Sequence, residues 1–208
     1  RNKMNFFEFK SELFKNICIS NHGISSRFEN FNFNNISRWI EKGYLIRLRN
    51  GIYTFPEYLT ASDISYYIAN RIYKPSYISL QSALAFYGLI PEAVVQIKSV
   101  STLKTTRFAN KFGNFTYNTV SPDKYFGYVQ KPFNKDISFI IAEPEKAILD
   151  LLYIFPFYNT VEEIIELRLD EELMSEIINK EKLESYAKKF NNKSLIKRLN
   201  ILTKEYQL

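Results

Sequence analysis

The chain has 208 residues, of which 46% are hydrophobic and 24% are charged. These are values of an ordinary globular protein that can bury its own core. A single cysteine, Cys18, and a single histidine, His22, exclude a disulfide within the chain and leave too few ligands for a zinc site. Cys18 is expected to be a small buried residue. No stretch has the pattern of a signal peptide or a membrane span, so we expect a cytoplasmic protein without metal or organic cofactor.

The net charge of +6 is distributed unevenly along the chain. Residues 1–58 contain 9 Lys and Arg against 5 Asp and Glu, and residues 59–142 contain 9 against 4. Residues 143–208 reverse the balance, with 10 against 13. The first two thirds therefore suit a polyanionic partner, whereas the acidic last third suits contact with a protein.

Three helices are expected before residue 43. Residues 5–16 place Phe6, Phe9 and Leu13 at helical spacing, and residues 24–29 fit a short second helix. The third helix is the most clearly patterned of the three.

This third helix spans residues 34–42 and is followed by Gly43, which suits a C-terminal cap. Ile36, Trp39 and Ile40 form its apolar side. Trp39 is expected to lie in the core rather than to stack on a base.

Residues 44–55 predict a β-hairpin, because Asn50-Gly51 is a favoured two-residue turn in which both positions take a positive φ. Such a turn predicts the pairs Arg49 with Ile52, Leu48 with Tyr53, Arg47 with Thr54, and Ile46 with Phe55. The apolar members of these pairs then share one face, and Arg47 and Arg49 project together from the other.

A helix, a glycine and a two-stranded ribbon with outward arginines are typical of a winged helix-turn-helix. Its last helix enters the major groove, and its hairpin contacts the DNA backbone or the minor groove. Asn34 is expected to cap the helix in preference to reading a base. The candidate DNA-binding residues are Asn34, Asn35, Ser37, Arg38, Lys42, Arg47, Arg49 and Asn50.

The remainder of the chain predicts a second, mixed domain over residues 59–208, after a winged helix in residues 1–58. The expected helices are 61–73, 80–87, 143–155 and 194–206, and the expected extended segments are 76–79, 94–102, 115–120, 125–129 and 137–142. The fold class is therefore α+β: an N-terminal winged helix-turn-helix, then a mixed α/β domain with a helical C-terminal tail.

Catalytic groupings are sparse in the sequence. His22 has no arguable nucleophile or acid beside it. Glu143, Glu145, Lys146 and Asp150 superficially resemble the acid–lysine group of a metal-dependent nuclease, but Lys146 directly follows Glu145 on a helix. A charged helix start is the favoured interpretation. We therefore expect a binding protein and not an enzyme, with a nuclease-like enzyme and a pure protein-interaction module as the alternatives.

Three blocks of the sequence resemble the AbiEi family of antitoxins, from the type IV toxin–antitoxin systems of abortive infection against phage. They are KGYLIRLRNGIYTFPEY, RIYKPSYISLQSALAFYGLIPE and IAEPEKAILDLLY, in matching order and spacing over about residues 33–155. The resemblance implies a transcriptional regulator that binds operator repeats in double-stranded DNA upstream of its own operon. It also implies that the second domain counters a nucleotidyltransferase-like toxin; self-association is a further expected contact. The matching DNA-binding positions are Asn35, Arg38, Lys42, Arg47, Arg49 and Asn50.

Overall fold

Aromatic side chains organise residues 4–55 into a winged helix. In the computed structural model, which describes residues 4–91, 95–133 and 137–208, Phe9 is fully buried and its ring lies 4.8 Å from that of Trp39 and 6.3 Å from that of Phe55. Ring pairs at these separations stabilise a fold by more than the burial of their apolar area alone. The elements around this cluster are α1 (Phe6–Leu13), β1 (Ile19–Ser20), α2 (Asn21–Arg27), α3 (Asn34–Glu41), β2 (Ile46–Arg49) and β3 (Ile52–Thr54), with strand order β1-β3-β2.

The second helix begins earlier than the predicted residues 24–29. The side chain of Ser20 accepts a hydrogen bond from the backbone N–H of Gly23 at 3.0 Å, so α2 starts at Asn21. Gly23 therefore lies inside α2 and not in a turn before the helix. A serine cap stabilises a helix start by satisfying a backbone donor, and here it outweighs the low helix propensity of glycine.

The hairpin of β2 and β3 forms as predicted, but its predicted register is wrong beyond the turn. Arg49 does pair with Ile52, whereas Arg47 pairs with Tyr53, because a bulge at Leu48 adds one residue to β2. The turn also differs: only Gly51 has a positive φ, of 76°. A turn whose positive φ falls only at its second central residue is neither of the two types that match the twist of the strands, and such turns are commonly accompanied by a bulge.

The second part of the chain is a six-stranded mixed sheet, reached through a short 3-10 helix, η1 (Pro56–Thr60). Its strands in spatial order are β6 (Thr106–Asn110), β7 (Gly113–Thr119), β5 (Gln96–Ser101), β4 (Ser76–Ile78), β9 (Ser138–Ala142) and β8 (Tyr128–Pro132). β5 pairs with β7 and β4 with β9 in parallel, and the other neighbours are antiparallel. The sequence did not predict β6, and it placed β8 three residues too early. Val94, the expected start of β5, lies outside the described residues.

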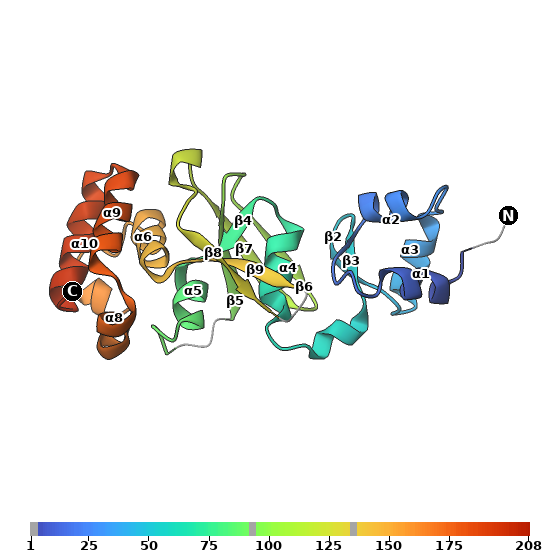
Figure 1. Cartoon of the computed structure of the whole chain (residues 1–208), viewed down its shortest axis with the longest axis horizontal. Helices are drawn as coiled ribbons and strands as arrows, with labels where there is room; N and C mark the ends of the chain where they lie inside the picture. The colour runs from blue at the N-terminus through green and yellow to red at the C-terminus, as the bar shows by residue number, and fades with distance from the viewer. Residues whose placement is uncertain (1–3, 92–94, 134–136) are drawn as a thin grey trace.

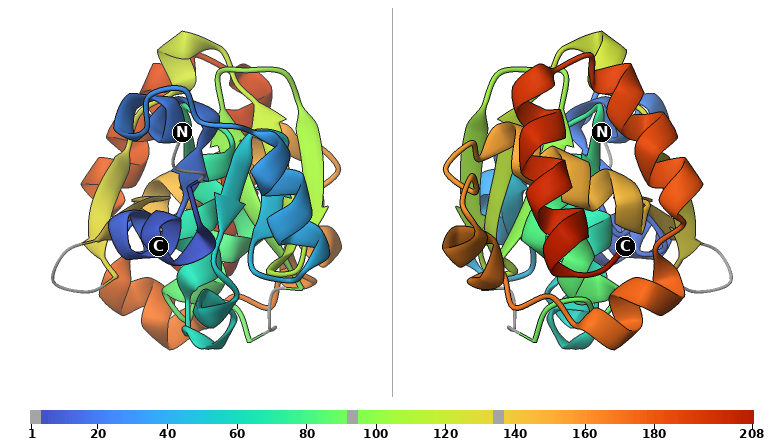
Figure 2. Two further views of the ribbon diagram at one scale, coloured as in Figure 1. Left: turned by 90° about the vertical axis from the view of Figure 1, so that its right-hand side faces the viewer. Right: turned by 90° about the vertical axis from the view of Figure 1, so that its left-hand side faces the viewer.

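Three helices flank this sheet: α4 (Ile64–Ile72), α5 (Leu80–Phe86) and α6 (Pro144–Ile154). The tail consists of α7 (Val161–Ile165), α8 (Glu171–Ile177), α9 (Lys180–Phe190) and α10 (Lys193–Glu205). The molecule is elongated, with the winged helix at one end, the sheet in the middle and the tail at the other end (Figure 1). Seen from the tail, α9 and α10 lie across α6 (Figure 2). Among the described residues, no helix is long and apolar enough to cross a bilayer.

Helix α6 is buried from Glu145 to Leu152, including the charged residues at its start. Lys146 and Asp150 are fully buried and form an ion pair one turn apart. The hydroxyls of Tyr77 and Ser79 donate to Asp150 Oδ2 at 2.9 and 2.8 Å, and Lys146 Nζ also donates to the Tyr77 hydroxyl at 2.8 Å. Buried charges are tolerated when they are paired and hydrogen-bonded in this way.

Replacing Asp150 with Ala should destabilise the protein strongly, because Lys146 would remain as an unpaired charge in the interior. The expected loss in the free energy of unfolding is about 3–5 kcal/mol, measured by urea denaturation. Asp123→Ala is the matched control, since Asp123 forms an ion pair with Lys124 at the surface and its removal should have little effect. Equal stabilities of the two variants would contradict the structural role of the buried pair.

Candidate nucleic-acid interface

One face of α3 is open to solvent and the other packs into the winged helix. Ile36 and Trp39 are buried and Ile40 is half-buried, as the helical period predicted. The exposed side chains of α3 and its C-terminal cap are those of Asn34, Ser37, Arg38, Glu41 and Lys42. The open face thus carries two cations, one acid and two small polar groups.

Asn35 is buried and does not face solvent with the other candidates. Its Oδ1 accepts a hydrogen bond from Arg38 Nη2 at 2.5 Å. With Lys42, these two residues line a hollow of about 220 Å³ that also borders the start of α1 at Met4 and Asn5. Asn35 therefore orients the Arg38 guanidinium, in place of the direct DNA contact expected from the sequence.

Asn34 is not the cap of α3, contrary to the prediction. Phe33 occupies the cap position without a side-chain hydrogen bond, and Asn32 Oδ1 accepts from the backbone N–H of Asn34 at 3.0 Å. The Asn34 side chain is exposed at the first turn of the helix. Its amide is a group of the kind that reads base edges, as in asparagine contacts to adenine.

The two arginines of the hairpin do not share an outward face, contrary to the prediction. Arg47 is exposed, whereas Arg49 is half-buried against the second part of the chain. Arg49 Nη1 donates to the carbonyl of Ile72 at 2.6 Å, at the C-terminal end of α4. Its guanidinium also lies 5.4 Å from the ring centroid of Tyr73 and 4.9 Å from that of Phe108.

The bulge in β2 explains this reorientation of Arg49. The side chain of Leu48 joins the hydrophobic cluster of the second part, and its carbonyl accepts from Asn110 Nδ2 at 3.0 Å. Asn50 remains exposed at the turn. The hairpin therefore contributes Arg47 and Asn50 to the open surface, while Leu48 and Arg49 attach it to the sheet domain.

Of the groups considered for catalysis, Lys146 and Asp150 come together, but as a fully buried ion pair. His22 is exposed on α2, and burial raises the pKa of the Cys18 thiol to about 12, which leaves it as an unreactive thiol at neutral pH. Glu143 accepts hydrogen bonds from Lys182 and Tyr186 at the tail, at 3.0 and 2.5 Å. Among the described residues, no three His, Cys, Asp or Glu side chains are grouped closely enough to hold a metal ion.

No protein-family model and no curated protein matches the chain.

Replacing Arg49 with Ala should loosen the attachment of the hairpin to α4. Loss of a charge-assisted hydrogen bond and two ring contacts should lower the free energy of unfolding by about 1–3 kcal/mol. Arg47→Ala removes the neighbouring exposed arginine and should leave the stability nearly unchanged. A destabilisation by Arg47→Ala as large as that by Arg49→Ala would show that the two side chains are not divided between solvent and the sheet domain.

Proposed function

We propose that the protein is a DNA-binding transcriptional regulator of the AbiEi antitoxin type, which acts in the cytoplasm and represses its own operon. The observation that carries the proposal is the open face of α3, in a winged helix whose exposed Arg47 lies on the adjoining hairpin. The recognition helix of such a domain enters the major groove of DNA.

In this mechanism, phosphate contacts give affinity and register, and a few side chains at the start of α3 give sequence preference. Arg38, Lys42 and Arg47 are the cations that neutralise phosphates. Asn34 and Ser37 face the base edges, since both are exposed at the first turn of α3. Asn35 contributes indirectly, because it holds the Arg38 guanidinium.

The burial of the charged residues on α6 favours a DNA-binding protein over the nuclease alternative. Lys146 and Asp150 bond to each other and to Tyr77 in the interior, so neither is presented to a DNA strand. Incubation of the protein with duplex DNA and Mg²⁺ or Mn²⁺ should therefore produce no cleavage. A cleavage activity that copurifies with the protein and is lost in a Lys146→Met variant would support the nuclease.

Anisotropy of a labelled duplex from the region upstream of the protein's own gene tests the DNA-binding proposal. The wild-type protein should bind this duplex more tightly than a scrambled one, with an affinity that falls steeply with salt. Arg38→Ala and Arg47→Ala should each reduce the slope of log K against log[salt] by roughly 0.9. Lys197→Ala is the control, because Lys197 is an exposed lysine on α10 at the far end of the molecule (Figure 1). Unchanged slopes in both arginine variants would exclude this interface.

The antitoxin part of the proposal places a nucleotidyltransferase-like toxin on the tail. The region 143–208 is the acidic third of the chain, and Phe157, Val161 and Ile165 expose 52%, 41% and 49% of their surface there. Apolar side chains within a charged surface are typical of protein-binding sites. The same surface also suits a second copy of the chain.

Val161→Ser with Ile165→Ser should abolish capture of a toxin encoded in the same operon, without changing DNA affinity. Truncation at residue 143 is a poorer test, because it removes α6 from the core. Copurification of the coexpressed toxin with the wild-type and the double variant measures the effect. Undiminished recovery with the double variant would exclude this surface as the toxin contact.

A further inference from the structure

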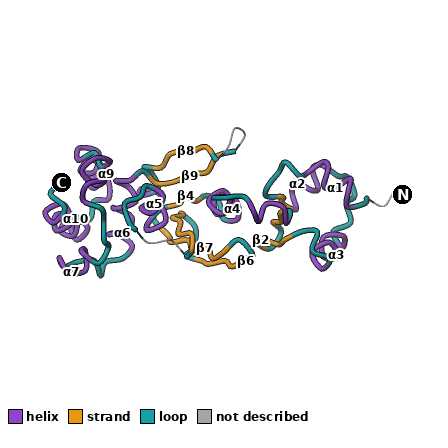
Figure 3. The backbone as a smooth tube through the Cα atoms, turned by 90° about the horizontal axis from the view of Figure 1, so that it is seen from below, coloured by secondary structure: helices purple, strands orange, loops and turns teal. Residues whose placement is uncertain are grey.

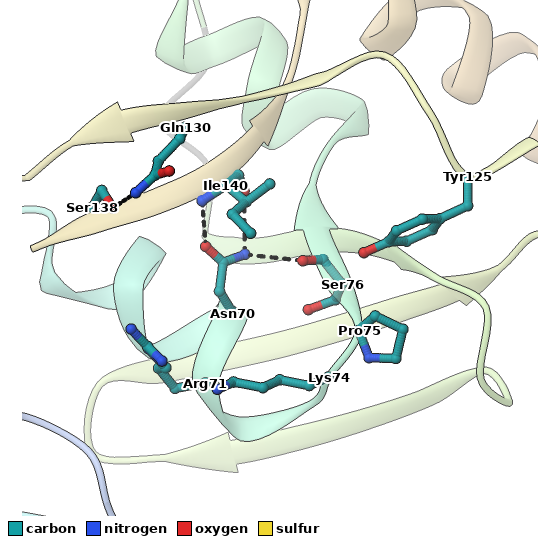
Figure 4. Close-up of a pocket in the computed structure, with 9 residues that line it drawn as sticks. All are labelled: Asn70, Arg71, Lys74, Pro75, Ser76, Tyr125, Gln130, Ser138 and Ile140. Carbon is teal, nitrogen blue, oxygen red and sulfur yellow. Dashed lines mark hydrogen bonds between the residues drawn. The ribbon is translucent and has the colours of Figure 1, made fainter.

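A second hollow, outside the winged helix, lies between the C-terminal end of α4 and the β8–β9 hairpin (Figure 4). Its volume is about 580 Å³, within the range of pockets that hold small organic ligands. Its lining includes Asn70, Arg71, Lys74, Ser76, Tyr125 and Ile140.

The described lining of this hollow carries a positive charge. Arg71 and Lys74 contribute two cations, and none of the lining residues that the structure describes has a carboxylate. No salt bridge of either cation is present among the described residues. Burial, and then the nearby charge of Arg71, lower the pKa of Lys74 from its usual range, so an anion placed between the two cations would relieve their repulsion.

The walls of the hollow are held in place by hydrogen bonds. Asn70 Oδ1 accepts from the backbone N–H of Ile140 at 2.6 Å, and Asn70 Nδ2 donates to the Ile140 carbonyl at 3.2 Å, so the end of α4 is fixed to β9. The Arg71 guanidinium lies 4.7 Å from the ring centroid of Tyr67, which restricts it before any ligand arrives. A site preorganised in this way loses less entropy on binding.

The end of the hollow opposite Arg71 is formed by Tyr125, whose ring packs against Tyr77 and Tyr128 and whose hydroxyl points toward Ser76 (Figure 4). Ile140 adds an apolar wall. A volume of 580 Å³ exceeds the need of inorganic phosphate alone. The combination of a paired cation site, hydroxyl groups and an aromatic end suits an anion that carries a ring.

We propose that this hollow binds a nucleoside monophosphate, with the phosphate on Arg71 and Lys74 and the base toward Tyr125. A guanidinium and an ammonium are the groups that proteins use for phosphate, and an aromatic ring is a common partner for a base. DNA is the less suitable occupant, because α3 and the β8–β9 hairpin lie on opposite sides of α4 in Figure 3. The site also adjoins Ile72, whose carbonyl accepts from Arg49 of the hairpin.

Isothermal titration of the full chain with AMP, GMP, CMP and UMP, and with the four nucleosides as controls, tests this site without any DNA. At least one nucleotide should bind with a Kd of about 1 mM or lower, and its nucleoside should bind at least about tenfold more weakly, because a charge-assisted contact is lost. The double variant Arg71→Gln, Lys74→Gln should weaken the nucleotide by at least about tenfold, whereas Lys111→Gln, at an exposed lysine, should not.

If the double variant does not fold, Ser138→Glu tests the site instead. It adds a negative charge to the lining and should abolish nucleotide binding. Binding of no nucleotide, equal binding of nucleosides, or wild-type affinity in the folded variants would overturn the proposal. Because the readout involves no DNA, its failure is distinguishable from failure of the regulator function.

Discussion

The hydrogen bond from Arg49 to the carbonyl of Ile72 attaches the hairpin of the winged helix to the sheet domain. It joins the hairpin to the C-terminal end of α4, where a helix leaves carbonyls without partners and carries a partial negative charge. A guanidinium is well suited to that position, because it donates a charge-assisted hydrogen bond and rests on the rings of Tyr73 and Phe108. With one hairpin arginine held in this way, Arg47 is the hairpin arginine that stays exposed beside α3.

The same principle, a charge stabilised by several partners at once, anchors the other end of the molecule. Lys146 lies between the rings of Phe126 and Phe190, with centroid distances of 4.9 and 4.8 Å, while Asp150 and Tyr77 satisfy its polar contacts. These contacts connect α6 to the sheet through β4 and to the tail through α9. An isolated charge at this depth would be costly, so the sheet and the tail are required together to bury α6.

Local periodicity predicted the elements whose burial follows from their own sequence. The apolar side of α3 is found as expected, and α6 and α10 lie within one residue of the expected ranges 143–155 and 194–206. The sequence did not predict features that depend on contacts between residues far apart in the chain. Asn110 fixes the bulge at Leu48 from 62 residues away, and Tyr77 and Ser79 accompany Asp150 from more than 70 residues away. No local pattern distinguishes Arg47 from Arg49, since the partner of Arg49 is Ile72 on α4, far along the chain.

Backbone amide chemical shifts, measured with and without the duplex from the protein's own upstream region, distinguish DNA binding through α3 from binding elsewhere on the protein. The shifts should change along α3 and at Arg47, while the amides of Arg49 and Ile72 stay unperturbed because their contact is internal. Perturbations that spare α3, or that centre on Arg49 and the end of α4, would contradict DNA binding through α3.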